Sequence, residues 1–296
     1  MRIIRAPERM QQEIAAHRKK GSSVGLVPTM GALHDGHLSL VNKAVKENDI
    51  AVVSIFVNPA QFGPREDYLR YPRPFKRDAE FCRKAGVDII FAPEPESMYS
   101  KNYLTYIKVE KISDMLCGKF RPGHFRGVAT VVAKLFNLCM PDKAYFGMKD
   151  YQQLKIIEQM TRDLNFPVKI VPCPIVRETS GLAMSSRNSY LDAKQKLYGA
   201  RIREALQQAS YMIKCNKSKN TGKTIANIEK TLLGIPGAKI DYVAVRSART
   251  LSPLNEINER AVILAAVWVG KTRLIDNIII DTNPKRQYRI SKKTAN

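Results

Sequence analysis

Short apolar runs alternate with helically spaced apolar positions along the first part of the chain. The run at residues 50–57 is continuous and rich in β-branched side chains, which is typical of a parallel strand buried on both faces. Similar runs predict strands at 24–27, 87–91, 144–146 and 168–176, and helical spacing predicts helices beginning near 38 and at 75–85, 128–138 and 151–162. Because strand and helix alternate, the pattern predicts an α/β fold with a Rossmann-like doubly wound parallel sheet.

The pattern changes after about residue 178. A loop at 181–189 leads to a predicted helix at 193–215, a charged segment, and predicted strands at 240–245 and 261–269. This part is expected to form a smaller C-terminal α+β domain. The predicted domains are therefore residues 1–178 and 179–296, and the second carries the loop Met184-Ser-Ser-Arg-Asn188.

The composition limits the class of protein. A chain of 296 residues with 44% hydrophobic residues is long enough to bury a large core. No apolar stretch reaches membrane-spanning length, and charges near the N-terminus interrupt the apolar segment that a signal peptide needs. The five cysteines form no Cys-x-x-Cys pair, which argues against a disulfide framework and a structural zinc site. We expect a cytoplasmic protein with no membrane partner.

The formal net charge of +22 raises the hypothesis of a nucleic-acid partner. The positive charge is spread along the chain, with concentrations at residues 214–223 and 285–293. Neither segment shows the interleaved basic and aromatic residues of a base-stacking surface. A solvated linker and a loose tail are the preferred interpretations, so no nucleic-acid partner is expected. The positive potential is expected to attract anionic substrates.

Two histidines three positions apart follow the first predicted strand, where the chain reads Val-Pro-Thr-Met-Gly-Ala-Leu-His-Asp-Gly-His-Leu from Val27 to Leu38. His34 and His37 fall on a strand-to-helix turn, beside backbone N–H groups that favour phosphate oxygens. The turn is therefore a candidate site for nucleotide phosphates. A His-x-x-His pair also occurs at purely structural positions, and a zinc site is disfavoured because no Glu follows His34.

Polar side chains follow two further predicted strands. Gln61 comes soon after the strand at 50–57, where its amide can donate and accept hydrogen bonds toward hydroxyls and carboxylates. Lys149 and Gln153 follow the strand at 144–146 and share a helix face, so a phosphate-binding cation and a substrate-binding amide would converge there. The structural alternatives are a loop cap at Gln61 and ordinary surface charges at Lys149.

Two loops carry basic residues. Arg187, with Ser185 and Ser186 beside it, suits a flexible clamp on a polyphosphate because its guanidinium offers a planar fork of donors. A simple surface turn is the alternative. The glycine-rich loop at 118–127 fits a phosphate contact and a structural crossover equally well, and no chemical role is assigned to His124.

Taken in order, these segments closely resemble the pantothenate synthetase (pantoate–β-alanine ligase) family of the nucleotidyltransferase superfamily. The matching stretches begin with Pro28-Thr-Met-Gly-Ala-Leu-His-Asp-Gly-His37 and continue with residues 56–62, 124–132, 145–153, 181–188 and 270–277. They cover nearly the whole chain. Several multi-residue blocks in one order are far more specific than any single motif.

The resemblance implies an ATP-dependent ligation in two steps. Pantoate carboxylate would attack the α-phosphate of ATP to give pantoyl adenylate and pyrophosphate. The amine of β-alanine would then attack the acyl carbon to give pantothenate and AMP. The resemblance also implies Mg²⁺ as a cofactor, a homodimer, and pantoate, β-alanine and ATP as small-molecule substrates. No residue is assigned to the metal.

The resemblance carries site residues over by position. His34 and His37 would contact the ATP phosphates, and His37 is the usual proton donor. An imidazolium, Lys149 and Arg187 would offset the negative charge that develops there, and these four residues are the expected catalytic set. The remaining expected ATP-site residues are Met30, Gly31, Gly147, Met148, Asp150, Val176, Met184, Ser185 and Ser186. Gln61 and Gln153 would bind pantoate, with Gln61 also near β-alanine.

The chain departs from the family pattern at Met148, where the family usually has Glu, so the role of this position is open. Thr179 and Ser180 likewise replace a usual Ala-Asp pair. A related nucleotidyltransferase that moves AMP or CMP onto a phosphorylated acceptor is the main alternative. It is disfavoured because Gln61 and Gln153 are neutral amides where such an acceptor would prefer cations.

Overall fold

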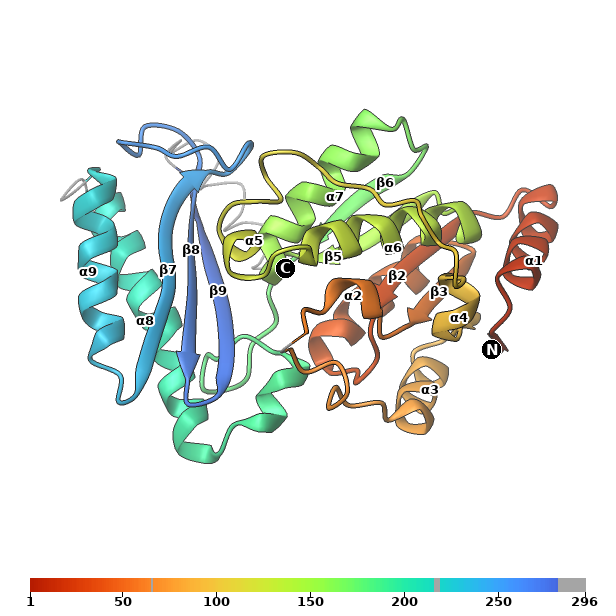
Figure 1. The fold of residues 1–296 in the computed structure, drawn as a ribbon, viewed down its shortest axis with the longest axis horizontal. Coiled ribbons are helices and arrows are strands. Elements are labelled where there is room, and N and C mark those ends of the chain that lie inside the picture. Colours follow the sequence, from red (N-terminus) through yellow and green to blue (C-terminus); the bar gives the residue numbers. More distant parts are fainter. Residues whose placement is uncertain (65, 216–218, 282–296) are drawn as a thin grey trace. The chain divides into compact units, whose positions relative to one another are not determined.

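Parallel strands form the centre of the first part of the chain. The computed structural model describes residues 1–64, 66–215 and 219–281, and within them six strands form one parallel sheet in the order β1-β4-β3-β2-β5-β6 (Figure 1). The strands are β1 (Arg2–Ile4), β2 (Val24–Thr29), β3 (Ile50–Ile55), β4 (Ile89–Phe91), β5 (Lys143–Gly147) and β6 (Lys169–Cys173). The predicted parallel α/β sheet is confirmed.

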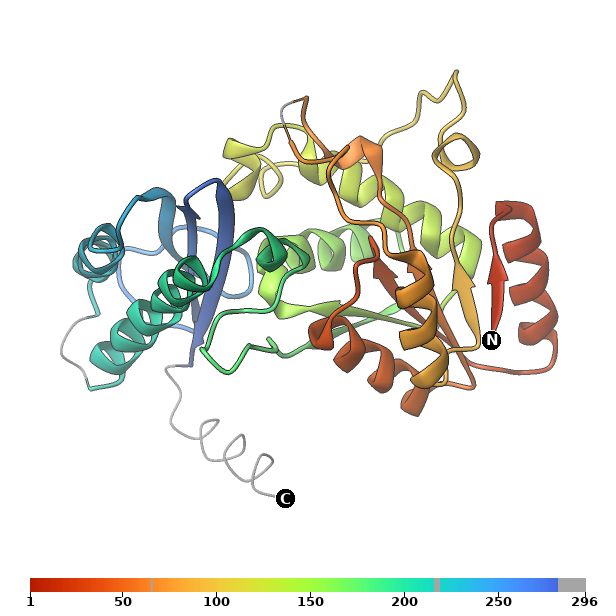
Figure 2. The ribbon, with the colours of Figure 1, turned by 90° about the horizontal axis from the view of Figure 1, so that it is seen from below.

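Helices cover both faces of this sheet. Figure 2 shows α6 on one side, and α2 and α3 on the other. Helix α6 packs against α1 and α7, while α2 packs against α3. The bounds of these helices are α1 (Pro7–Lys19), α2 (Asp35–Glu47), α3 (Phe75–Lys84), α6 (His124–Cys139) and α7 (Tyr151–Asp163). The short helices are α4 (Pro95–Met98), α5 (Cys117–Phe120), and the 3₁₀ turns η1 (Pro59–Gln61), η2 (Met148–Asp150) and η3 (Ser186–Tyr190). Burial from both sides explains the continuous apolar runs in the strands.

The order of the strands reverses at β2. The chain passes from β2 to β3 on one side of β2 and later returns to β5 on its other side. Ligands of open parallel sheets bind at the carboxyl ends of the strands that flank such a reversal. Residues 30–37 follow β2 and residues 148–153 follow β5, so the reversal brings the histidine turn and the Lys149 segment to one edge of the sheet.

A second unit follows, and among residues 219–281 three antiparallel strands form its sheet. The strands are β7 (Ala238–Ser247), β8 (Ala261–Val269) and β9 (Thr272–Ile280), and helices α8 (Ala193–Lys214) and α9 (Thr221–Leu233) share a hydrophobic core with them. Helix α8 begins with a capping box in which Asp192 and Gln195 each accept a backbone N–H from the other. The predicted smaller α+β part is confirmed.

The two units are interleaved in sequence. The first contains Met1–Val176 and Met184–Ser186, and the second contains Arg177–Ala183 and the described residues from Arg187 onward. The predicted boundary after residue 178 lies close to the first crossing, but the loop that it assigned to the second domain is divided between the units. That residues 1–178 and 179–296 act as separate domains stays a proposal.

Several elements were not predicted from the sequence, among them β1, α1, α9 and β9. Strand β1 is a three-residue edge strand, and α1 buries only Met10 and Ile14, so each gives a weak pattern. The predicted charged linker at 214–223 is wrong in part, because α8 reaches Lys214 and α9 begins at Thr221. Residues 216–218 and the basic segment 285–293 lie outside the described residues.

Gly127 in α6 allows close packing against η1. A Cβ added at this position would lie 2.1 Å from the carbonyl oxygen of Ala60 and 2.6 Å from the backbone nitrogen of Gln61. Since backbone atoms cannot rotate away, Gly127→Ala is expected to lower the free energy of unfolding by about 1–3 kcal/mol, despite the better helix propensity of alanine. Urea unfolding measures the change. An unchanged or higher midpoint would contradict this packing.

Candidate functional site

A buried carboxylate shapes the turn between β2 and α2. Asp78 of α3 is 1% exposed, and its two oxygens accept hydrogen bonds from the backbone N–H groups of Ala32 and Leu33, each at 2.8 Å. Gly31 precedes them with φ +78°, a conformation that favours glycine. Burial raises the pKa of Asp78, although both backbone donors act to lower it. Asp78 therefore fixes the backbone from which the histidines project.

Sequence reasoning missed Asp78, which lies in a basic segment far from the histidines in the chain. The sequence contains one indication that Asp78 has a structural role. Asp78 and the apolar Cys82 are four residues apart in the predicted helix at 75–85, so they share a face, and that face is buried. A carboxylate on a buried face requires partners, and here these are backbone N–H groups of the turn.

His34 caps the first turn of α2. Its Nδ1 accepts a hydrogen bond at 3.1 Å from the backbone N–H of Gly36, so in the neutral ring the hydrogen lies on Nε2. A Cβ at Gly36 would lie 2.8 Å from the His34 ring, which explains the glycine. The His34 and His37 rings lie with their centroids 4.1 Å apart. Capping thus fixes the orientation of one histidine and places it beside the other.

The surroundings of His37 favour the neutral form of its ring. Burial, and then the nearby charges of His34 and Lys149, lowers its pKa from the ordinary value of 6.5 to about 3. The residue keeps some exposed surface, but its Nδ1 is enclosed and has no hydrogen-bond partner in the part of the chain that the structure describes. This differs from the imidazolium expected from the sequence. A bound anion would favour the protonated ring.

The lowered pKa of His37 predicts a pH-dependent stability. Between pH 6.5 and 3 the unfolded histidine binds a proton while the folded one does not, so the free energy of unfolding falls as the pH drops through this window. In urea unfolding between pH 7 and pH 5, the free energy of unfolding of His37→Gln should therefore fall less than that of the parent. His17→Gln, in α1, removes a histidine that lies 3.4 Å from Glu13 and serves as the control; it should keep the part of the loss that His37 causes. An equal pH dependence in the parent and His37→Gln would contradict the assigned pKa.

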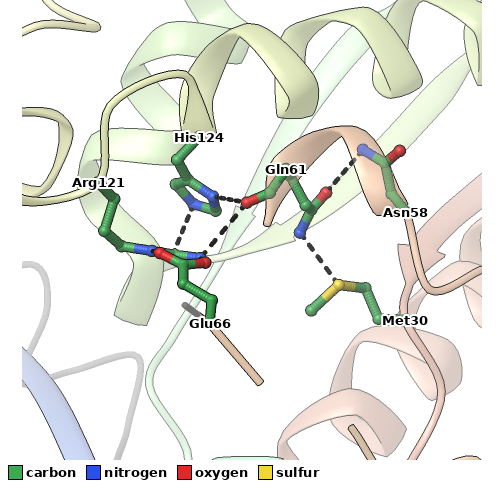
Figure 3. Close-up of polar contacts among 6 residues, drawn as sticks. All are labelled: Met30, Asn58, Gln61, Glu66, Arg121 and His124. Atoms are coloured by element: carbon green, nitrogen blue, oxygen red, sulfur yellow. Dashed lines mark hydrogen bonds and ion pairs between the residues drawn. The ribbon is translucent and has the colours of Figure 1, made fainter. Parts of the chain in front are cut away.

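Gln61 presents hydrogen-bond donors at the end of η1 (Figure 3). The Nδ2 of Asn58 donates to the carbonyl oxygen of Gly127 at 3.1 Å and to the Oε1 of Gln61 at 3.0 Å. Because a backbone carbonyl can only accept, these contacts fix the orientation of both amides. The Nε2 of Gln61 therefore points the other way, and lies 3.0 Å from the sulfur of Met30. The Tyr99 hydroxyl supports this orientation by donating to the Oδ1 of Asn58 at 2.8 Å.

The segment after β5 supplies the predicted cation. Gly147 ends the strand, Lys149 lies in η2, and Gln153 follows in the first turn of α7. The effect of Lys149 on the pKa of His37 places its charge near the histidine turn. The neighbouring Gln152 is instead structural, since it is buried and accepts a hydrogen bond at 3.0 Å from the backbone N–H of Cys117.

The loop at 184–186 also reaches the histidine turn. The backbone N–H of Met184 donates to the carbonyl oxygen of Val176 at 3.0 Å, and the Ser186 hydroxyl donates to the carbonyl oxygen of Ala32 at 3.2 Å. These contacts lie within the first unit. Arg187 belongs to the second unit, so its convergence with the other phosphate-binding candidates stays a prediction.

The parallel Rossmann-type sheet places this chain among the α/β proteins that have a candidate ligand site at a reversal of strand order. In this chain the site contains a histidine turn and a lysine. The chain belongs to the pantoate-beta-alanine ligase family, whose sequence profile matches residues 2–279. This confirms the family and the ligase class predicted from the motifs, and places the protein among enzymes of pantothenate biosynthesis.

Relatives and solved structures agree with this assignment. The chain is 52% identical to the pantothenate synthetase of Endomicrobium trichonymphae over 280 residues, which cover 95% of this chain and 98% of that protein. It is 50% identical to that of Moorella thermoacetica over 96% of this chain and 100% of the relative.

Two crystal structures share the fold. The pantothenate synthetase from Thermus thermophilus matches with a TM-score of 0.88 at 42% identity, covering 94% of this chain and 99% of that one. The pantoate-beta-alanine ligase from Francisella tularensis, complexed with beta-gamma ATP and beta-alanine, matches with a TM-score of 0.79 at 37% identity, over 96% and 99% of the two chains.

Proposed function

We propose that this protein condenses (R)-pantoate with β-alanine in an ATP-dependent reaction that forms pantoyl adenylate. A carboxylate oxygen of pantoate attacks the α-phosphorus of ATP, and pyrophosphate leaves. The amine of β-alanine then attacks the acyl carbon, the acyl–oxygen bond breaks, and AMP leaves with that oxygen. Family membership over residues 2–279 is the observation that carries this proposal. The ATP and β-alanine in the Francisella ligase complex support the choice of substrates.

The proposed ATP site is built at the reversal of strand order. In this proposal His34, His37 and Lys149 of the first unit bind the phosphates, where negative charge grows as the α-phosphorus is attacked, and Arg187 is the fourth phosphate ligand that the family resemblance implies. The other proposed contacts are Met30, Gly31, Gly147, Met148, Asp150, Val176, Met184, Ser185 and Ser186. His37 begins as a neutral ring, so its proposed duty as a proton donor requires that the approaching phosphates first raise its pKa. Positioning is therefore the main contribution of this site.

Gln61 and Gln153 are the proposed pantoate ligands. The fixed orientation of Gln61 presents N–H donors beside Met30, which suits a carboxylate or hydroxyl oxygen of pantoate. A neutral donor holds the carboxylate without pairing it to a cation, so the oxygen keeps its nucleophilic charge. We also place β-alanine close to Gln61.

Mg²⁺ is proposed as the companion of ATP. Within the described ranges no group of three His, Cys, Asp or Glu side chains forms a metal cage. Mg²⁺ commonly binds nucleotide phosphates with several waters and only one or two carboxylates, and it then supplies charge that offsets the phosphates. We therefore assign the ion to the ATP phosphates and assign no residue of this chain to it.

We further propose a homodimer, as the family resemblance implies, and a cytoplasmic location, as expected from the hydropathy pattern of the sequence. In the part of the chain that the structure describes, no helix is both long enough and apolar enough to cross a membrane. Light scattering after size-exclusion chromatography distinguishes a 33.4 kDa monomer from a dimer of twice that mass.

Release of pyrophosphate tests the adenylation step. With ATP, Mg²⁺ and pantoate present and β-alanine omitted, we expect a burst of pyrophosphate in proportion to the enzyme. ATP without pantoate is the control and should release none. Pyrophosphate that appears only when β-alanine is added would contradict a first step that makes pantoyl adenylate.

A further inference from the structure

The first turn of α6 supports the segment that carries Gln61. The close approach of Gly127 to Ala60 leaves no room for a side chain between α6 and η1. The carbonyl oxygen of Gly127 also accepts a hydrogen bond from Asn58, which caps η1. The main chain of η1 therefore packs directly against α6. Residues at the start of α6 can thus determine the position of Gln61.

His124, the first residue of α6, contacts Gln61 directly (Figure 3). Its Nδ1 lies 2.8 Å from the carbonyl oxygen of Gln61, and its Nε2 lies 3.0 Å from the Nη1 of Arg121. The carbonyl oxygen only accepts and the guanidinium N–H only donates. Both contacts are satisfied together when the ring is neutral, with hydrogen on Nδ1 and a lone pair on Nε2.

Arg121 is fixed by an ion pair on its other side. Its Nε and Nη2 donate to the two carboxylate oxygens of Glu66, at 2.7 and 2.6 Å. The side chains of Arg121 and Glu66 are only 15% and 24% exposed, so this bidentate pair is partly shielded from water. Arg121 thus holds the tautomer of His124 that donates to Gln61.

We propose that His124 is a positioning residue for substrate binding, held in its neutral Nδ1–H form by Arg121. It binds the main-chain carbonyl of Gln61 and thereby sets the place of the Gln61 side-chain amide. In this proposal the part of the loop at 118–127 that carries Arg121 and His124 supports the substrate site. This inference rests on the proposed function, in which Gln61 binds pantoate and His124 touches no reacting atom.

Substitutions at His124 test the inference. His124→Ala is expected to raise the KM for pantoate by about tenfold, the equivalent of 1.4 kcal/mol, and to change the KM for ATP by less than about twofold. His124→Asn keeps an N–H donor near the place of Nδ1 and should stay within about threefold of the parent. His124→Gln moves its donor toward the place of Nε2 and should resemble the alanine variant.

Two controls separate the possible failures. His17→Ala, in α1, should leave both KM values unchanged. Gln61→Ala should raise the KM for pantoate. If it does not, both the role proposed for Gln61 and this inference are wrong. If Gln61→Ala raises the KM while His124→Ala does not, this inference alone is wrong.

The inference can be tested even if one variant is unstable. Should His124→Ala fail to fold, the asparagine and glutamine variants are compared instead. Rescue by asparagine alone supports positioning through Nδ1. Equal KM values for pantoate in these two variants overturn it. The ring ¹⁵N signals of His124 give an independent check, since hydrogen on Nε2 in the parent protein would also overturn it.

Discussion

Replacing Lys149 with alanine is expected to lower kcat for adenylate formation by about 10²- to 10³-fold, which corresponds to about 3–4 kcal/mol. The ammonium group stands at the strand-order reversal, and its charge already acts on His37. In the proposed reaction it faces phosphates whose negative charge increases in the transition state, so its loss affects kcat more than ATP binding. Pyrophosphate release with ATP and pantoate measures the step.

A second lysine provides the matched control. Lys155 lies in α7, six residues further along the chain, and pairs with Glu158 at 2.7 Å. Lys155→Ala should keep kcat within about twofold of the parent, because an ion pair of this kind contributes little. Lys149→Ala should also raise the pKa of His37, because the nearby positive charge that lowers it is gone. Full activity in Lys149→Ala would exclude this lysine from the phosphate site.

Replacing Gln61 with glutamate is expected to raise the KM for pantoate by about 100-fold or more. Asn58 donates to the Oε1 of Gln61, so the second carboxylate oxygen of the variant would occupy the place of the N–H donor. A carboxylate would then face the carboxylate of pantoate, and like charges in contact cost several kcal/mol. Gln61→Ala removes the donor without adding a charge and should raise the KM less.

Steady-state kinetics with pantoate as the varied substrate checks the effect of Gln61→Glu. Gln11→Glu makes the same chemical change on the exposed surface of α1 and should leave the KM for pantoate unchanged. A Gln61→Glu variant that binds pantoate no worse than Gln61→Ala would show that the amide does not act as a donor to a carboxylate.

Local sequence patterns predicted the sheet well because a parallel strand that is buried on both faces gives a continuous run of apolar residues. The apolar run at 50–57 became β3, and the helical spacing at 151–162 became α7 with one further residue. Strand β1 could not be predicted in this way, since three residues carry no periodicity and its place is set by pairing with β4. Helix α9 was hidden by the charged segment that precedes it, although its buried face contains Ile228 and Leu232.

The site was predictable only as far as its residues are recognisable by local spacing. His34 and His37 fall in one turn, and Lys149 follows a strand end, so the sequence indicated them as candidates. Asp78 and His124 act through backbone groups that are 45 and 63 residues away in sequence, and no local pattern reports such contacts. The neutral state of His37 likewise depends on burial, which spacing does not reveal.

Oxygen transfer from pantoate to AMP tests the central claim most directly. Pantoate labelled with ¹⁸O in its carboxylate is converted with ATP and β-alanine, and the AMP is analysed by mass spectrometry. If the carboxylate attacks the α-phosphorus, each AMP formed carries one labelled oxygen, since the acyl–oxygen bond breaks in the second step. Unlabelled AMP formed together with pantothenate would contradict the adenylate and the reaction proposed for this site.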